Sequence, residues 1–162
     1  MGARSTIAET GRPARAGALL RALPAGAVLA LGNSMPVRDI DTYAPPGGHA
    51  ITVLHQRGAS GIDGVISGAA GAAAVAEGPV ALMIGDLSFL HDVNGLWPIR
   101  RHDLSLTVVL VTHEHDIAEF ASRVVSFRDG RVIEDRPVDR PKDAAAMAAQ
   151  LRAGQAAERM QP

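Results

Sequence analysis

Four short apolar runs punctuate the first two thirds of the chain, and helical segments lie between them. The runs lie at residues 27–31, 50–54, 80–84 and 106–111. Within each run the apolar residues succeed one another without alternating with polar ones, a pattern typical of strands buried on both faces of a sheet. The helical segments lie at residues 14–23, 64–77 and about 88–100. Strands that alternate with helices predict an α/β fold with a mainly parallel sheet flanked by helices.

The chain changes character after residue 111. The remaining sequence predicts a polar stretch, a short helix, a β-hairpin and a solvated Ala-rich helix, at residues 112–116, 117–121, 124–134 and 143–159. The hairpin is predicted because Asp129-Gly130 between two apolar runs is a strong signal for a type I′ turn. We therefore expect a first domain at residues 1–111 and a tail at residues 112–162 that contains a C-terminal hairpin and helix.

The composition is typical of a soluble globular protein and excludes several classes of function. Of the 162 residues 47% are hydrophobic and 20% are charged, and the net charge is −1. A nearly neutral chain has no general attraction for nucleic acid. The absence of cysteine excludes disulfides and thiolate metal sites and suits a cytoplasmic location. We expect neither membrane insertion nor a signal peptide, because no apolar run approaches roughly 18 residues and the N-terminus lacks an apolar stretch.

Two of the predicted strands end in residues that favour a ligand site. The run 27–31 leads into Gly32-Asn33-Ser34, and the run 80–84 leads into Gly85-Asp86. In open α/β sheets, ligands bind at the carboxyl ends of the strands. The carboxylate of Asp86 could hold Mg²⁺, which prefers oxygen ligands, and the N–H groups of the next residues would face an anion. The alternative is that Asp86 is only a helix N-cap.

Three blocks of sequence together carry a resemblance to a known family. They are Gly32-Asn-Ser-Met-Pro-Val-Arg-Asp-Ile-Asp41, Arg57-Gly-Ala-Ser-Gly-Ile-Asp-Gly-Val-Ile-Ser67 and Gly85-Asp-Leu-Ser-Phe-Leu-His-Asp-Val-Asn-Gly-Leu96. In order and spacing they resemble the C-terminal cofactor domain of 2-succinyl-5-enolpyruvyl-6-hydroxy-3-cyclohexene-1-carboxylate synthase, an enzyme family of menaquinone biosynthesis. The resemblance covers about residues 13–111. Each block alone is moderately specific, and the three together are highly specific.

The resemblance implies a site for thiamine diphosphate and Mg²⁺. The family joins a decarboxylated 2-oxoglutarate unit to isochorismate with this cofactor. By motif position Asp86 would ligate Mg²⁺, and the residues beside it would hold the diphosphate, namely Gly85, Leu87 and Ser88. Ile62 would be the apolar residue that supports the bent conformation of the cofactor. Ser60 and Gly61 would line the same pocket.

The resemblance also places a substrate end in the site, with Ser34, Arg38 and Arg57. An arginine fork suits substrate carboxylates because it donates two parallel hydrogen bonds. The alternative for both arginines is that they are solvated loop cations. No catalytic residue is implied in this chain, because the activating glutamate of the family lies in a separate pyrimidine-binding domain. The family is oligomeric, so we expect a homodimer or a missing partner domain. His91 and Asp92 are interpreted as structural.

The resemblance breaks after the run 106–111. The family's second Mg²⁺ ligand is an asparagine, and its position falls at His113. Imidazole suits transition metals better than Mg²⁺. The glycine-rich turn that would come next, and that supplies a further carbonyl ligand, is absent. We therefore expect thiamine diphosphate and Mg²⁺ to bind weakly.

Residues 106–136 resemble instead the C-terminal end of an ABC-transporter ATP-binding subunit. In that family a histidine after a strand senses the γ-phosphate, and His113 has this position. The chain lacks the phosphate-binding loop Gly-x-x-x-x-Gly-Lys-Ser/Thr of such ATPases. His113 is then either a solvated loop histidine or part of a chance metal site with Glu114 and His115. We interpret the chain as a chimaera joined at residues 106–111. For its function, the alternatives to the synthase domain are an ATPase-derived interaction fragment and a non-functional remnant.

Overall fold

The computed structural model describes residues 12–44, 50–56, 58, 61–128 and 131–143. It divides into two compact units, Met1–Val111 with Asp129–Arg131 and Thr112–Arg128 with Val132–Pro162. Among the described residues no helix is both long enough and apolar enough to cross a membrane.

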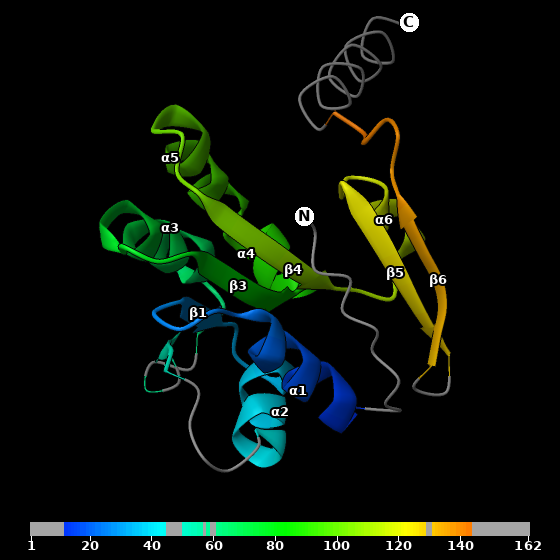
Figure 1. Cartoon of the computed structure of the whole chain (residues 1–162). Helices are drawn as coiled ribbons and strands as arrows, with labels where there is room; N and C mark the ends of the chain where they lie inside the picture. Colours follow the sequence, from blue (N-terminus) through cyan, green and yellow to red (C-terminus); the bar gives the residue numbers. More distant parts are fainter. Residues whose placement is uncertain (1–11, 45–49, 57, 59–60, 129–130, 144–162) are drawn as a thin grey trace, which may run out of the picture. The chain divides into compact units, whose positions relative to one another are not determined.

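A four-stranded parallel sheet forms the centre of the first unit (Figure 1). Its strands are β1 (Val28–Leu31), β2 (Thr52–His55), β3 (Val80–Gly85) and β4 (Leu106–Val111). They lie in the order β2-β1-β3-β4, and each neighbouring pair is parallel. All four apolar runs therefore form strands, and the predicted α/β fold with a parallel sheet is confirmed.

Helices cover both faces of the two central strands. The helices are α1 (Arg12–Ala22), α2 (Met35–Tyr43), α3 (Val65–Val75), α4 (Asp86–His91) and α5 (Leu96–Arg101), with a 3₁₀ turn, η1 (Val93–Gly95), before α5. Residues of α1 and α2 contribute to the hydrophobic cluster on one face. Residues of α3 and α5 contribute to the cluster on the other. Figure 1 shows α1 and α2 on the opposite side of the sheet from α3 and α5.

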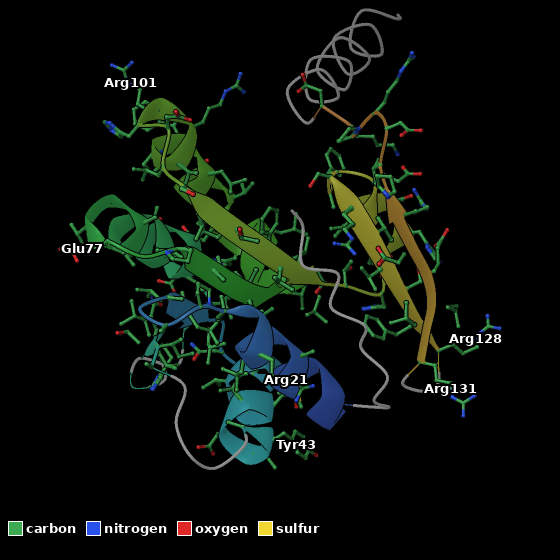
Figure 2. The ribbon with its side chains drawn as sticks, viewed as in Figure 1. Arg21, Tyr43, Glu77, Arg101, Arg128 and Arg131 are labelled. Carbon is green, nitrogen blue, oxygen red and sulfur yellow. The ribbon has the colours of Figure 1, made fainter. Side chains whose placement is uncertain are left out.

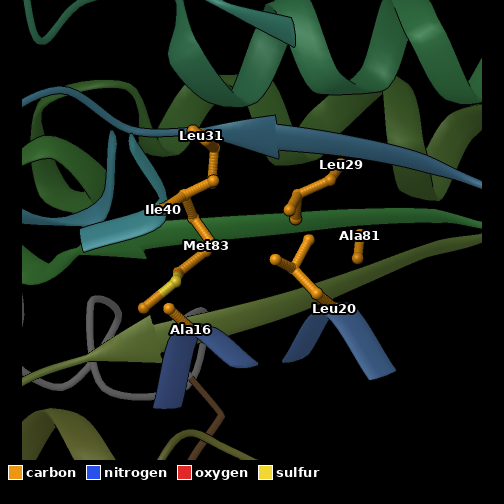
Figure 3. Packing of buried hydrophobic residues seen from close by; sticks show 7 residues of the cluster. All are labelled: Ala16, Leu20, Leu29, Leu31, Ile40, Ala81 and Met83. Atoms are coloured by element: carbon orange, nitrogen blue, oxygen red, sulfur yellow. The ribbon is translucent and has the colours of Figure 1, made fainter. Parts of the chain in front are cut away.

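Alternate side chains of β1 and β3 supply the two clusters. On one face Leu29, Leu31, Ala81 and Met83 pack with Ala16, Leu20 and Ile40 (Figure 3). On the other face the strand residues are Ala30, Leu82 and Ile84, and the helix residues are Val65, Ile66 and Ala69. Successive residues of a strand point to opposite faces, so a strand covered on both sides needs apolar residues at every position. For β1 and β3 the prediction of burial on both faces is confirmed.

The same prediction is wrong for the two edge strands. All four residues of β2 are exposed, and no residue of β4 is fully buried. Both strands pair on one side only within the described sheet. A continuous apolar run predicts a strand but does not reveal whether helices cover it.

Two helical segments differ from the prediction. Helix α2 was not predicted; its second residue is Pro36, which is tolerated in a first turn because the N–H there has no helical partner. The predicted helix at residues 88–100 is interrupted by η1. Pro98 lies in the first turn of α5, and an unbroken helix would place it against the carbonyl of Asn94, where it would clash and donate no hydrogen bond.

The second unit contains α6 (His115–Ala118) and an antiparallel hairpin of β5 (Arg123–Arg128) and β6 (Arg131–Pro137). The predicted hairpin is thus confirmed, although its turn residues Asp129 and Gly130 lie outside the described residues. Figure 2 shows Arg128 and Arg131 at the ends of the two strands nearest the turn. The predicted helix at residues 143–159 also falls outside the described residues, apart from Asp143.

Polar pairs, rather than a core, connect the two strands of this hairpin. Arg123 donates from Nε and Nη2 to the two carboxylate oxygens of Asp135, at 2.8 and 2.7 Å. Ser126 Oγ donates to Glu134 Oε2 at 3.0 Å. None of the described residues of the second unit is buried. A two-stranded sheet without a packed face is marginal in water, and exposed pairs of this kind add only a little to its stability.

The first prediction concerns the core. Leu82 of β3 is fully buried, at 0% exposure, in the cluster that β3 forms with α3. Leu82→Ala should lower the free energy of unfolding by about 2–5 kcal/mol, through lost burial and the cavity left behind. The matched control is Leu90→Ala, since Leu90 is 55% exposed and should change stability by less than about 0.5 kcal/mol. Urea unfolding followed by circular dichroism measures both. Equal effects would mean that the sheet does not pack as described.

The second prediction concerns the hairpin. The hydrogen bonds from Arg123 hold the pKa of the Asp135 carboxyl below its usual value. A lowered folded-state pKa stabilises the hairpin above the unfolded pKa, and this stabilisation is lost as the pH falls through the folded pKa. Arg123→Gln should raise the pKa of Asp135, and added salt should weaken the effect in the parent chain.

A titration of the Asp135 side-chain carbon signal by NMR measures this change. Arg136→Gln is the matched control, because Arg136 pairs with Glu134 and not with Asp135. If the two variants shift the pKa of Asp135 equally, the pairing of Arg123 with Asp135 is refuted.

Candidate functional site

The carboxyl end of β1 holds a buried amide. Gly32 continues the sheet, with its N–H donating to the carbonyl of Met83 at 2.8 Å. Asn33 comes next and is only 6% exposed. Its Nδ2 donates to the carbonyl oxygen of Gly61, and its Oδ1 is buried with no hydrogen-bond partner among the described residues. The end of β1 is thereby joined to the loop after β2.

Ser34 turns the chain from β1 into α2. Its φ of 72° and ψ of −124° lie outside the regions that residues with a side chain usually adopt. Such outliers persist where the surrounding structure holds them, and they concentrate at functional sites. Ser34 is exposed, and so is Arg38 one turn into α2. Arg38 therefore lies on a helix rather than in a loop, and its exposure is compatible with both interpretations, a substrate ligand and a solvated cation.

The second block forms the loop between β2 and α3. Gly61 and Ile62 are described, whereas Arg57 and Ser60 lie outside the described residues. Ile62 is 38% exposed, which is high for a large apolar side chain. The loop is also held near its end, where Gln56 Nε2 donates to the carbonyl of Gly64 at 2.9 Å. The loop thus presents an apolar side chain between two anchored glycines.

The third block begins at the end of β3. Gly85 occupies the N-cap position, and Asp86 is the first residue of α4. Asp86 is therefore the first helical residue and not the N-cap itself, while a purely structural role at the start of the helix stays an alternative. Asp86 is half-buried, and its Oδ1 accepts a hydrogen bond from the N–H of Leu87 at 2.7 Å. Leu87 is exposed and Ser88 is buried.

Asp92 joins the third block to the second. Its two carboxylate oxygens accept hydrogen bonds from the N–H of Ser67 at 2.9 Å and from Ser67 Oγ at 3.1 Å. The N-cap of α3 is Gly64, which has no side chain to satisfy these first-turn groups. A Cβ on Gly95 would lie 2.7 Å from the Ser67 nitrogen, so the two blocks pack backbone to backbone. The interpretation of Asp92 as structural is confirmed; His91 is exposed.

The three blocks therefore meet around the loop before α3. Asn33 of the first block holds this loop through Gly61, and Asp92 of the third block holds the first turn of α3, directly after the loop, through Ser67. The residue pairs are 28 and 25 positions apart in sequence. Of the predicted site residues, the described ones lie in or beside these three segments.

The tail contributes no metal site among the residues that the structure describes. His113 is strongly exposed, and its Nε2 lies 3.1 Å from Glu114 Oε1. His115 begins α6 and is also exposed. No group of three or more His, Asp or Glu side chains in the described part could hold a metal ion. The chance metal site is therefore wrong, and an exposed loop histidine is the better interpretation of His113.

No family model matches the chain. This chain is similar to curated synthases of the family that the three blocks resemble. The synthase of Sorangium cellulosum is 49% identical over 121 residues, 74% of this chain and 18% of the relative. That of Geobacillus kaustophilus is 55% identical over 91 residues, 56% of this chain and 16% of the relative. That of Listeria monocytogenes is 47% identical over 112 residues, 69% of this chain and 19% of the relative.

All three relatives are named 2-succinyl-5-enolpyruvyl-6-hydroxy-3-cyclohexene-1-carboxylate synthase, and this chain spans less than a fifth of their length. A solved structure described as a thiamin diphosphate-dependent enzyme, from Mycobacterium smegmatis, is 22% identical. It covers 65% of this chain and 21% of that one, with a TM-score of 0.47. The similarity to the synthases is thus confirmed. The similarity of residues 106–136 to an ABC-transporter subunit stays a prediction.

The third prediction concerns the contact between blocks. Asp92→Ala removes both acceptors of Ser67 and should lower the free energy of unfolding by about 1 kcal/mol, as the loss of a helix cap does. Hydrogen exchange of the Ser67 amide should accelerate more than that of Ala70. The control is Glu77→Ala, since Glu77 is an exposed acidic residue just beyond the other end of α3 (Figure 2). Unchanged exchange at Ser67 would contradict the assigned role of Asp92.

Proposed function

We propose that this chain is a partial thiamine-diphosphate- and Mg²⁺-binding domain of a menaquinone-pathway synthase, and that it is inactive alone. The observation that carries the proposal is the meeting of the three family blocks at the carboxyl ends of β1, β2 and β3, joined through Asn33 and Asp92. Parallel α/β sheets bind ligands at this edge. The similarity to named synthases supports the same function. A cytoplasmic location is part of the proposal.

The residues present fit the cofactor in part. Asp86 offers Mg²⁺ a half-buried carboxylate, which is a suitable hard ligand. Gly85, Leu87 and Ser88 stand beside it in the position that holds the diphosphate in the family. The exposed Ile62 offers an apolar support for a ring, and Gly61 lies next to it. The cofactor supplies an electron sink for the decarboxylation of a 2-oxo acid.

The substrate end of the site remains a proposal from the resemblance. Ser34 and Arg38 are both exposed near the end of β1 and could meet a substrate carboxylate; Arg57 has the same proposed role. A separate pyrimidine-binding domain would supply the glutamate that activates the cofactor, and general acid–base catalysis of this kind is worth about 10²–10⁴-fold. Without that second domain, one side of the bound cofactor would stay exposed to solvent. For these reasons the chain alone should form no product from isochorismate and 2-oxoglutarate.

One alternative rests on the tail. The exposed His113 after β4, the short α6 and the hairpin come in the order seen at the end of an ABC-transporter ATP-binding subunit, so residues 112–162 could be an interaction fragment of that origin. ATP binding measured by calorimetry would favour this alternative. A chain that binds neither ATP nor thiamine diphosphate would be a non-functional chimaeric remnant.

The fourth prediction is weak binding of the cofactor. Titration calorimetry with Mg²⁺ and thiamine diphosphate should give a dissociation constant in the millimolar range or weaker, about −4 kcal/mol. Asp86→Asn should weaken it further, because the metal loses a charged ligand. The matched control is Asp103→Asn, since Asp103 is exposed and its φ of 50° is one that asparagine adopts readily.

A further pair of changes tests the second metal position. Thr112→Asn together with His113→Asn should strengthen binding only slightly, because the titration contains no pyrimidine-binding domain to bury the other side of the cofactor. A micromolar dissociation constant for the unmodified chain would overturn the proposal of weak binding. Equal affinities of the Asp86 and Asp103 variants would overturn the role of Asp86 as the metal ligand.

A further inference from the structure

The peptide bond between Asn94 and Gly95 joins a reactive pair of residues. The chain contains two asparagines, Asn33 and Asn94, and only Asn94 is followed by glycine. A glycine nitrogen attacks the side-chain amide of a preceding asparagine more readily than other backbone nitrogens, because glycine has no Cβ and reaches most backbone conformations. The product is a cyclic succinimide. Asn94 is therefore the candidate for spontaneous deamidation in this chain.

The reaction needs only water as a partner. The Gly95 nitrogen forms a bond to Cγ of Asn94, the bond from Cγ to Nδ2 breaks, and the proton of the attacking nitrogen leaves with Nδ2 as ammonia. Water then opens the ring at either carbonyl. One opening gives aspartate, and the other gives isoaspartate, in which the main chain runs through the former side chain and is one carbon longer.

The fold holds the attacking nitrogen in place. Asn94 is exposed, so water reaches its side chain, whereas Gly95 is buried at the end of η1. The N–H of Gly95 donates to the carbonyl of Asp92 at 2.8 Å. Attack on Asn94 requires this hydrogen bond to break and the turn to open. The backbone of the turn, rather than burial of the side chain, thus blocks the reaction.

The packing of η1 against α3 explains why glycine occupies position 95. A Cβ there would lie 2.7 Å from the Ser67 nitrogen and 2.9 Å from Cβ of Ile66, so a larger residue would separate η1 from α3. Asp92 holds the same contact, because its carboxylate accepts hydrogen bonds from the Ser67 N–H and Oγ. The fold therefore requires the residue that makes Asn94 reactive, and Asp92 keeps it closed.

We propose that Asn94 is a deamidation site which the fold keeps closed, and that opening of η1 from α3 exposes it to irreversible conversion. A fast local opening makes the open form react in proportion to its population. Hydrogen exchange of the Gly95 amide requires release of the same N–H group. Folding should therefore slow the conversion of Asn94 at least as strongly as it slows exchange of the Gly95 amide.

Conversion has a structural consequence for the third block. Isoaspartate lengthens the main chain directly before Gly95, which already lies in close contact with Ser67. The longer backbone cannot restore both this contact and the hydrogen bond to Asp92. Each converted molecule should therefore keep a loosened η1, and its Ser67 amide should exchange faster than that of the intact chain.

The test follows the conversion of Asn94 in the full chain at mildly alkaline pH, in buffer and in unfolding urea. Peptide mass spectrometry separates Asn94 from Asn33, which precedes Ser34 and is the internal reference. In urea Asn94 should convert faster than Asn33. In buffer its conversion should be slowed by at least the protection factor of the Gly95 amide, measured by hydrogen exchange in the same buffer.

Variants test the role of Asp92. In buffer Asp92→Ala should raise the rate at Asn94 about fivefold, which corresponds to about 1 kcal/mol less stability of the closed turn. In urea its rate should equal that of the parent chain. Ser67→Ala removes only one of the two donors and should raise the rate less, so it replaces Asp92→Ala if that variant does not fold. Glu77→Ala is the control and should keep the parent's rates.

Conversion of Asn94 in buffer at the rate measured in urea would overturn the inference, because the turn would then give no protection. Conversion of Asn33 ahead of Asn94 in urea would also overturn it. Equal rates in buffer for Asp92→Ala and the parent would overturn the role of Asp92 in closing the site. None of these outcomes depends on a bound cofactor, so the proposed function is tested separately.

Discussion

Parallel strands are stable when both of their faces are covered, and the first unit satisfies this condition only at its centre. Leu29, Leu82 and Ile84 are completely buried because α1 and α2 cover one face of β1 and β3, and α3 with α5 covers the other. This packing fixes the positions of the strand ends, from which the loops of the candidate site begin. The site depends on it, since its residues project from the ends of the same strands.

The strands could be predicted from the sequence because each is a continuous apolar run, and the hairpin could be predicted from Asp129-Gly130. Whether helices cover β2 and β4 could not be predicted, because a run of apolar residues looks the same in an edge strand as in a central strand. Helix α2 was not predicted because Ser34 and Pro36, at its start, are residue types that usually indicate a turn. The site was predictable only as motifs; the pairing of Asn33 with Gly61 joins residues that no local pattern connects.

The second unit is held by exposed polar pairs rather than by a buried apolar core. Its strands are connected by Arg123 with Asp135 and by Ser126 with Glu134, all of them exposed or nearly so. The ammonium group of Lys142 bonds to the carboxylate of Glu119 and lowers the pKa of Glu119. The backbone N–H of Lys142 also donates to the backbone carbonyl of Glu119, at 2.9 Å. Exposed ion pairs contribute little each and are screened by salt. Order in this unit should therefore depend on solution conditions more than order in the first.

The edge strands β2 and β4 have a consequence for handling the protein. Each has a row of backbone donors and acceptors on its outer side, and Val53, Leu54 and Val111 are exposed along them. Natural sheets protect such edges with charges, proline or bulges, because an open apolar edge can recruit a strand from another molecule. Neither strand contains a Lys, Arg, Asp, Glu or Pro. Self-association at high concentration is thus built into the described sheet, independently of any ligand.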